Sequence, residues 1–139
     1  MSNVSIFRSF LQDKNVYMEE VQEDDGVIFF RTRQDFDNGG SVVMVVVFNE
    51  AQDLIDLQIF GVASITNPLK QEAVLNLINE LNVNYRFTKF LEIDGNISIQ
   101  YSYGVQQGSL NPEYLMDVLL MLLRAAEDNY PKFMKLQWA

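Results

Sequence analysis

Acidic side chains are the most numerous groups in this chain that could take part in chemistry, and many of them gather at two turns. Residues 23–25 are Glu-Asp-Asp before Gly26, and Asp35 and Asp37 lie at the start of a second turn. If both turns lie at the same end of a sheet, their carboxylates could hold a hard cation such as calcium. The spacing matches no EF-hand loop, and adjacent acids in turns are usually just hydrated. We therefore expect hydrated turns and no metal site.

Two further acids, Asp56 and Glu92, lie inside predicted strands. They could act as paired carboxylates in acid–base catalysis if one of them were buried enough to raise its pKa. Both fall on the less apolar face of their strands, so a surface position is the better expectation. Gly39 and Gly40 belong to a hairpin turn and do not precede a helix, so they form no phosphate-binding loop. We predict no catalytic residue.

Arg31 and Arg33 stand at alternate positions of one predicted strand and therefore project to the same side. Guanidinium groups in this arrangement can grip a carboxylate or a phosphate. On an exposed sheet face, such arginines more often balance neighbouring acids, and this part of the chain has many acids. We expect the second role.

Cysteine and histidine are both absent from the 139 residues. Their absence excludes thiol nucleophiles, disulfides, the usual zinc sites, imidazole catalysis and every Ser-His-Asp arrangement. Only carboxylates, hydroxyls, tyrosines and lysines remain as catalytic groups. We therefore expect a protein that is not an enzyme and uses no cofactor. The redox compartment stays open, because a chain without cysteine is indifferent to it.

The net charge of −9 comes mostly from residues 1–66, which hold eleven acids against four bases. Nucleic acid is a poor partner for such a chain, because its binding depends on basic residues that displace counterions from phosphates. An anionic membrane surface is disfavoured for the same reason. A basic protein or peptide would be attracted.

A single domain over residues 1–139 is the natural organisation for this length and a hydrophobic fraction of 48%. The N-terminal segment carries no basic leader followed by an apolar run, which argues against a secretory signal. The longest apolar runs, at 42–48 and 115–123, fall short of the ~20 residues that span a bilayer. We expect a cytoplasmic protein.

Hydrophobic periodicity and turn residues predict three helices and six strands. The helices are predicted over 3–13, from Asn67-Pro68 to near Asn82, and from Asn111-Pro112 to about Asn129. The strands are predicted over 17–22, 27–33, 41–48 and 54–65, and on both sides of a turn at 94–96. The tail at 131–138, which begins with Pro131, has no firm prediction. The order α-β-β-β-β-α-β-β-α indicates an α+β fold with helices packed on a single antiparallel sheet.

Two of these strands differ in how their apolar residues are spaced. The strand at 41–48 is apolar at every position from Val42 onward, as expected of a strand covered on both faces. The strand at 54–65 alternates, and its apolar face includes Gly61 and Ala63. If helices cover only one face of the sheet, something else must cover the other face of the first strand.

The residues Asn-Val-Asn at 82–84 separate a helical period from a strand period. Amides tolerate the left-handed conformation that commonly ends helices, so the helix is predicted to stop near Asn82. In the following strand, alternation places Phe90 on one face and an apolar set on the other: Tyr85, Phe87, Leu91 and Ile93. Arg86 and Lys89 then fall on opposite faces and form no cationic patch.

The last predicted helix has more apolar surface than a helix needs in order to rest on a sheet, since its apolar arc covers roughly two-thirds of its circumference. Five residues on its two shoulders form our candidate interface with a partner or with a second copy of the chain: Tyr114, Met116, Val118, Leu120 and Met121. Methionines suit adaptable interfaces, which favours this hypothesis. The alternative is a helix wedged between the sheet and another helix.

Several motifs in the second half of the chain form a recognisable set. They are the capped helix start at Asn67-Pro68, "AVLNLINELN" at 73–82, "YRFTKFLEIDGNISIQYSY" at 85–103 and the capped start of the last helix. Over residues 67–125 the chain thereby resembles the YbjN-like proteins, which are labelled bacterial sensory transduction regulators and grouped with the type III secretion chaperone-like fold. The resemblance implies an α-β-β-β-(β)-α-β-β-α domain, frequently dimeric, whose relatives bind protein segments and do not turn over substrates. It transfers no catalytic residue.

Two functions remain open at this point. The first is a non-enzymatic regulatory or chaperone-like module of bacterial type. It would bind a protein or peptide through an exposed sheet face or a shoulder of the last helix, as a homodimer. The alternative is a sensor that binds a small ligand in a pocket between helix and sheet, lined by Tyr85, Tyr101 and Tyr103.

Overall fold

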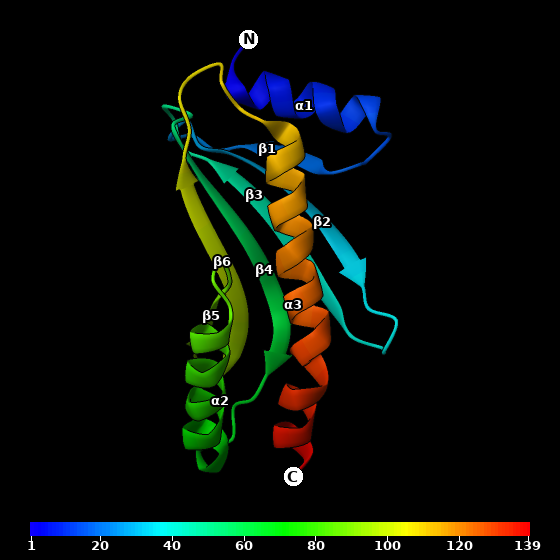
Figure 1. Cartoon of the computed structure of the whole chain (residues 1–139), viewed down its shortest axis with the longest axis vertical. Coiled ribbons are helices and arrows are strands. Elements are labelled where there is room, and N and C mark those ends of the chain that lie inside the picture. The colour runs from blue at the N-terminus through cyan, green and yellow to red at the C-terminus, as the bar shows by residue number, and fades with distance from the viewer.

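Figure 1 shows the computed structural model, which describes all residues from Met1 to Ala139. The helices are α1 (Asn3–Asp13), α2 (Gln71–Asn84) and α3 (Pro112–Trp138), and a 3₁₀ helix, η1 (Pro68–Lys70), leads into α2. The strands are β1 (Glu19–Gln22), β2 (Ile28–Asp35), β3 (Ser41–Phe48), β4 (Leu54–Ser64), β5 (Lys89–Ile93) and β6 (Asn96–Gly104). The predicted order of elements is confirmed.

The six strands form one antiparallel sheet in the order β1-β2-β3-β4-β6-β5. The first four strands form a meander in which each pairs with the next. The chain then passes through α2 to the far edge, and β6 returns from the β5–β6 hairpin to pair with β4. The predicted α+β class is therefore confirmed.

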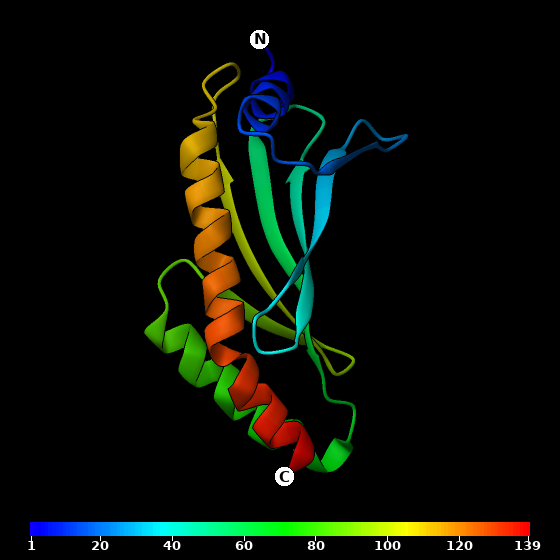
Figure 2. The same ribbon diagram turned by 90° about the vertical axis from the view of Figure 1, so that its right-hand side faces the viewer.

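The helices cover one face of this sheet, and no helix lies on the other (Figure 2). α3 crosses the covered face and packs mainly on β4. Three fully or almost fully buried phenylalanines join α1 to the sheet. Phe7 meets Phe30 edge to face with 4.9 Å between ring centroids, and Phe48 packs against both. Burying each such ring stabilises the fold by about 1.5–3 kcal/mol relative to leaving it exposed.

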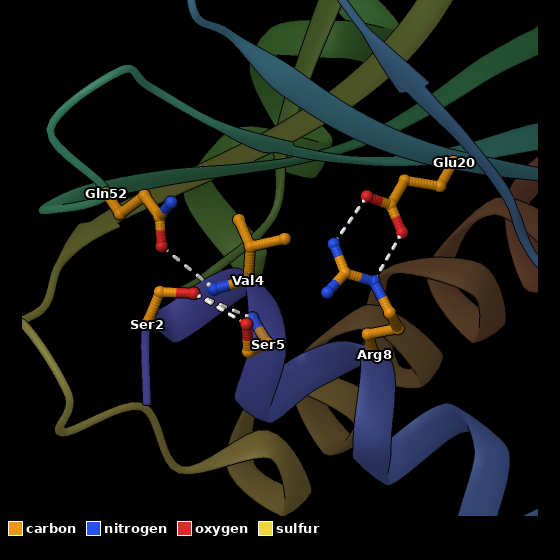
Figure 3. Close-up of polar contacts among 6 residues, drawn as sticks. All are labelled: Ser2, Val4, Ser5, Arg8, Glu20 and Gln52. Atoms are coloured by element: carbon orange, nitrogen blue, oxygen red, sulfur yellow. Dashed lines mark hydrogen bonds and ion pairs between the residues drawn. The ribbon is translucent and has the colours of Figure 1, made fainter.

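Polar contacts fix the N-terminal end of α1 (Figure 3). The Ser2 hydroxyl accepts a hydrogen bond from the Ser5 amide at 3.1 Å and caps the helix. The Val4 amide lies in the first turn, where no intrahelical acceptor exists, and it donates to Oε1 of Gln52 at 2.9 Å. The helix start is thus tied to the turn between β3 and β4.

Arg8 holds the middle of α1 to the sheet edge. Its Nε and Nη2 donate to the two carboxylate oxygens of Glu20 on β1 at 2.8 and 2.7 Å, as Figure 3 shows. These hydrogen bonds, helped by charge attraction, lower the pKa of Glu20 and raise the pKa of Arg8, although burial opposes both shifts. A bidentate pair of this kind fixes orientation as well as distance.

Asn3 is buried and connects α1 to two loops. Its Nδ2 donates to the backbone carbonyls of Gln52 at 2.8 Å and Gln106 at 3.0 Å, and its Oδ1 accepts from the Leu110 amide at 3.1 Å. The Nδ2 and Oδ1 atoms of Asn3 therefore all have hydrogen-bond partners, which offsets the cost of burying this side chain.

A bulge interrupts β4 at Gly61. The pairing of β4 with β6 shifts register between Ile59 and Ala63, and Gly61 has a φ of +80°. Val62 and Ala63 are both buried, whereas Gly61 is exposed. The predicted place of Gly61 on the apolar face is therefore wrong, because two extra residues of β4 interrupt the alternation here and Gly61 has a backbone conformation that glycine adopts readily.

β5 begins at Lys89, and its inward side chain is Phe90, which is 1% exposed. The predicted grouping of Phe90 apart from Leu91 and Ile93 is confirmed, and the Phe90 side is the buried one, since Ile93 is 63% exposed. The predicted place of Phe87 in this strand is wrong, because Phe87 lies before the strand begins. The alternation was counted from Tyr85. The backbone between that residue and the strand is irregular, so Tyr85 and Phe87 do not belong to the alternation of β5.

α2 ends at Asn84, two residues beyond the predicted end near Asn82. The Asn82 amide does not cap the helix. Its Nδ2 donates to the Phe90 carbonyl at 3.1 Å and its Oδ1 accepts from the Phe90 amide at 2.7 Å. The side chain thus occupies the outer edge of β5 as a neighbouring strand would. Arg86 lies in the connection after α2, so the predicted strand position opposite Lys89 is also wrong.

α3 continues through Pro131 to Trp138, so its predicted end near Asn129 is wrong. Proline removes an intrahelical hydrogen bond and commonly kinks a helix. Figure 2 shows the axis of α3 changing direction in its lower part. Burial beyond the proline offsets the loss, because Phe133 is fully buried and packs on Phe90 with 6.1 Å between ring centroids.

Candidate functional site

The face of the sheet that carries no helix, here called the open face, is unusually apolar along β3. Alternate residues of this strand point into the core: Val42, Met44, Val46 and Phe48. The residues between them, Val43, Val45 and Val47, belong to the open face, where Val43 is 38% exposed, Val47 is half-buried and Val45 is covered to 9% exposure. The prediction of a strand covered on both faces is therefore wrong for a single chain.

Charged residues lie beside these valines on the open face. Arg31 pairs with Glu19 of β1 at 2.8 Å. Arg33 lies 3.6 Å from the carboxylate of Asp35, and both of these side chains are more than 70% exposed. The predicted balance between arginines and neighbouring acids is confirmed for both. Asp56, on β4, accepts a hydrogen bond from the Ser102 hydroxyl and forms no ion pair.

A hollow of about 360 Å³, here called the α3 groove, opens between α3 and the connection that precedes β5. Its lining is mostly apolar, with one acid and one base: Phe87, Tyr114, Asp117, Val118, Leu120, Met121 and Arg124. Phe87, Tyr114 and Leu120 are 42%, 41% and 37% exposed. The volume falls within the range of about 300–1,000 Å³ that ligand sites occupy.

Two aromatic residues of β6, Tyr101 and Tyr103, connect the groove residues Phe87 and Tyr114. Phe87 meets Tyr101 edge to face, Tyr101 stacks on Tyr103 with 5.8 Å between centroids, and Tyr103 meets Tyr114 edge to face at 5.5 Å. The hydroxyl of Tyr103 is buried and has no hydrogen-bond partner. Burial, with smaller contributions from Tyr114 and Tyr101, raises the pKa of Tyr103 to about 12.

The structure brings together four of the five predicted interface residues. Tyr114, Val118, Leu120 and Met121 all line the α3 groove, although Val118 is buried at 3% exposure and forms its floor. Met116 is half-buried, packs against the core and does not line the groove. The sequence analysis missed Phe87, Asp117 and Arg124. Phe87 could not be predicted, because a loop brings it to the helix. Asp117 and Arg124 could have been predicted from their spacing along the helix.

The predicted tyrosine pocket does not form as a single site. Tyr101 and Tyr103 stack together, but Tyr85 packs on Phe90 and accepts a hydrogen bond from the buried Asn129 at 3.0 Å. Tyr85 therefore supports the contact between β5 and α3 and takes no part in the α3 groove.

The acids do not converge. The turns at 23–25 and 35–37 follow each other at opposite ends of β2, and no group of three acids lies close enough to hold a metal ion. Asp56 belongs to the open face, whereas Glu92 pairs in register with the core residue Ile97 and accepts a hydrogen bond from the Gly95 amide at 2.6 Å. They form no catalytic pair.

A wider hollow of about 780 Å³ lies between the β2–β3 turn and the end of α3. Tyr130, Met134 and Trp138 contribute to it, and Tyr130 also packs on Phe36 with 5.7 Å between centroids. The sequence analysis missed this hollow because it ended the helix before Pro131.

Comparison with protein-family models identifies the family. The YbjN model, described as "Putative bacterial sensory transduction regulator", matches residues 3–135. The chain belongs to the YbjN family. The match extends the resemblance at 67–125 to the whole sheet and to all three helices. No curated protein matches this YbjN-family chain.

The family description gives YbjN proteins a regulatory role in bacteria. None of the helices of this YbjN-family chain combines the length and the apolar character needed to cross a membrane. The two surfaces described above, the α3 groove and the open face, each present apolar side chains to solvent in this YbjN-family chain.

Proposed function

We propose that this chain is a non-enzymatic regulatory module that binds a segment of a partner protein in the α3 groove and that acts as a cytoplasmic homodimer. The observation that carries the proposal is the set of exposed apolar side chains around the groove. Three large ones, Phe87, Tyr114 and Leu120, remain over a third exposed beside a hollow of about 360 Å³. Exposed apolar surface around a concavity is typical of an interaction site.

The charges of the groove define the chemistry of the segment. Asp117 and Arg124 both line it, two helical turns or about 10 Å apart along α3, and neither forms an ion pair within the chain. A matching segment has an apolar anchor residue between a basic and an acidic side chain. The net charge of −9 favours a partner that is basic overall.

The chaperone-like part of the proposal rests on the same surface. A groove that accepts an apolar side chain can shield a partner segment before the partner folds or assembles, in the manner implied by the likeness to type III secretion chaperones. Nucleic acid and membrane surfaces are excluded from the proposed partners, because ten basic residues stand against nineteen acids.

The test is selection of binding peptides from a random display library, followed by affinity measurement on three proteins. The wild-type chain and Leu75→Glu should bind the selected peptides equally, because Leu75 is exposed on α2, away from the groove. Leu120→Glu, a change of the same type at a similarly exposed position, should weaken binding at least about tenfold. Equal affinities for the Leu120 and Leu75 variants would refute the groove as the binding site.

A small-ligand sensor is the second candidate, and one observation favours it. The Tyr103 hydroxyl is buried without a partner, although such groups are usually hydrogen-bonded. A small ligand that entered beside Tyr114 could supply the missing partner. Native mass spectrometry of the chain purified under gentle conditions would detect a retained molecule, and its loss in Tyr103→Phe but not in Leu120→Glu would favour the sensor over the peptide binder.

A further inference from the structure

The open face carries an apolar band that runs diagonally across three neighbouring strands, and its central residue, Val45, is only 9% exposed between Arg31 and Gln58. The strand register places Phe29 beside Val47 on one row and Val43 beside Phe60 on another, with Val45 on the row between them. Val21 of β1 lies beside Phe29 and extends the band to that edge. Phe60 is 43% exposed, and no helix covers any part of the band.

Two oppositely charged residues flank this band at symmetric positions. Arg33 lies on β2 in the row of Val43, and Asp56 lies on β4 in the row of Val47. Val45, on the strand and the row between, is therefore the midpoint of the line that joins them. A two-fold axis through Val45 that runs roughly along the band exchanges the two positions and lays the band on itself.

We propose that the open face is the interface with a second copy of this chain, in which Arg33 of each copy pairs with Asp56 of the other. This inference rests on the proposed homodimer and assigns its surface. An interface built on a two-fold axis must be self-complementary, and here Phe29 and Phe60 meet their own copies while Arg33 meets Asp56. Arg31, in the central row beside Val45, keeps its ion pair with Glu19 of its own chain. Two antiparallel sheets that pack face to face are a common arrangement.

The local contacts leave both charged groups available for this pairing. Asp56 has a hydroxyl partner and no cation. Arg33 is 74% exposed, donates one hydrogen bond to the Ser41 hydroxyl at 3.0 Å and lies 3.6 Å from the carboxylate of Asp35. A hollow of about 380 Å³ beside Arg33 is lined also by Tyr17, Glu19, Arg31, Thr32 and Val43, and Glu19 is already paired with Arg31. The hollow gives the Asp56 carboxylate of the second copy room to reach a guanidinium group.

The test is a charge exchange read by sedimentation velocity over a range of protein concentrations. The wild-type chain should form a dimer. Arg33→Asp and Asp56→Arg should each weaken the dimer at least about tenfold, because each single change creates two like-charge contacts. The double variant should restore the dimer, since the exchanged charges attract again. Both residues are on the surface, and circular dichroism will show that every variant is folded.

The control is Leu120→Glu, which changes the α3 groove and should leave the dimer unchanged. A wild-type chain that stays monomeric at about 100 μM, which sets the dissociation constant in the millimolar range, would overturn both the homodimer and this interface. A dimer that resists both single charge changes, or that Leu120→Glu dissociates, would overturn the interface alone. Peptide binding by the same variants tests the α3 groove separately.

Discussion

The two faces of the sheet are built from the same strands, and yet helices cover only one of them. On the covered face, β3 contributes Val46 and Phe48, which are fully buried beneath the helices. On the open face it contributes Val43, which is 38% exposed, although residue type and strand are the same. An apolar strand therefore does not indicate how many of its faces a single chain covers.

The neighbouring residues Glu19 and Glu20 show the same difference between the two faces, here for charged side chains. Glu20 points to the covered face, where it binds Arg8 of α1 through two hydrogen bonds. Glu19 points to the open face and meets Arg31 of the adjacent strand through one hydrogen bond at 2.8 Å. One glutamate joins a helix to the sheet, whereas the other links two strands that are already paired.

Phenylalanines on the two faces should give the largest difference. Phe48→Ala should lower the free energy of unfolding by about 3–5 kcal/mol, because it leaves a cavity among Phe7 and Phe30. Phe60→Ala, on the open face, should cost less than about 1 kcal/mol when the chain is dilute enough to be monomeric. Urea unfolding measures both values. Equal losses would mean that the open face is as tightly packed as the core.

Asn82 binds the outer edge of β5, at the border between the two faces, and its replacement should have an intermediate effect on the free energy of unfolding. Asn82→Ala should cost about 1–2 kcal/mol, because it removes both hydrogen bonds to the backbone of Phe90, a residue that is almost fully buried. Asn79→Ala is the control, since Asn79 is exposed on the same helix and forms no side-chain hydrogen bond within the chain. Hydrogen exchange of the Phe90 amide should become faster only in the first variant.

The two glutamates separate the faces through the pH dependence of stability. Glu20→Gln should cost about 1 kcal/mol at pH 7 and Glu19→Gln no more than about 0.5 kcal/mol. Because the pKa of Glu20 is lowered in the folded state, its contribution is present above its ordinary pKa of 4.5 and is lost as the pH falls through the folded value. The stability difference between wild type and Glu20→Gln should therefore vanish in acid. A difference that persists there would exclude ionisation as its cause.

Tyr103, on the covered face, should show the smallest effect at neutral pH. Its hydroxyl has no partner, so Tyr103→Phe should change the free energy of unfolding by no more than about 0.5 kcal/mol. The pKa of Tyr103 is about 12 in the folded state against an ordinary 10, so this tyrosine contributes stability below pH 10 that is lost as the pH rises toward 12. Between neutral pH and pH 11, the free energy of unfolding should therefore fall more for the wild type than for the variant, as urea denaturation at both pH values would show.

The regular parts of the fold could be predicted from local pattern, and the exceptions have specific causes. Periodicity located all three helices and six strands because each buries one face, and Asn67-Pro68 and Asn111-Pro112 marked helix starts through capping and a fixed φ. Pro131 was misjudged because Phe133, buried by tertiary packing, offsets the local penalty. Tyr85 and Phe87 were wrongly assigned to β5 because residues 85–88 form a connection and not a strand.

The candidate site could be predicted only on its helical side. Tyr114, Val118 and Met121 follow from spacing along α3, since residues three and four apart share a helix face. Phe87 joins them through a loop whose path no periodicity describes. Tyr85 was grouped with Tyr101 and Tyr103 by residue type alone, and the structure places it against Phe90 and Asn129.

The sequence by itself determined the class of the fold, the order of its elements and the absence of thiol and imidazole chemistry. These properties depend on local backbone preference and on composition, which neighbouring residues specify. Tertiary structure alone decided which face of β3 is covered, where Asn82 binds and how Phe87 meets α3. Each of these contacts joins residues that packing brings together, so the information resides in their distance in space and not in their spacing along the chain.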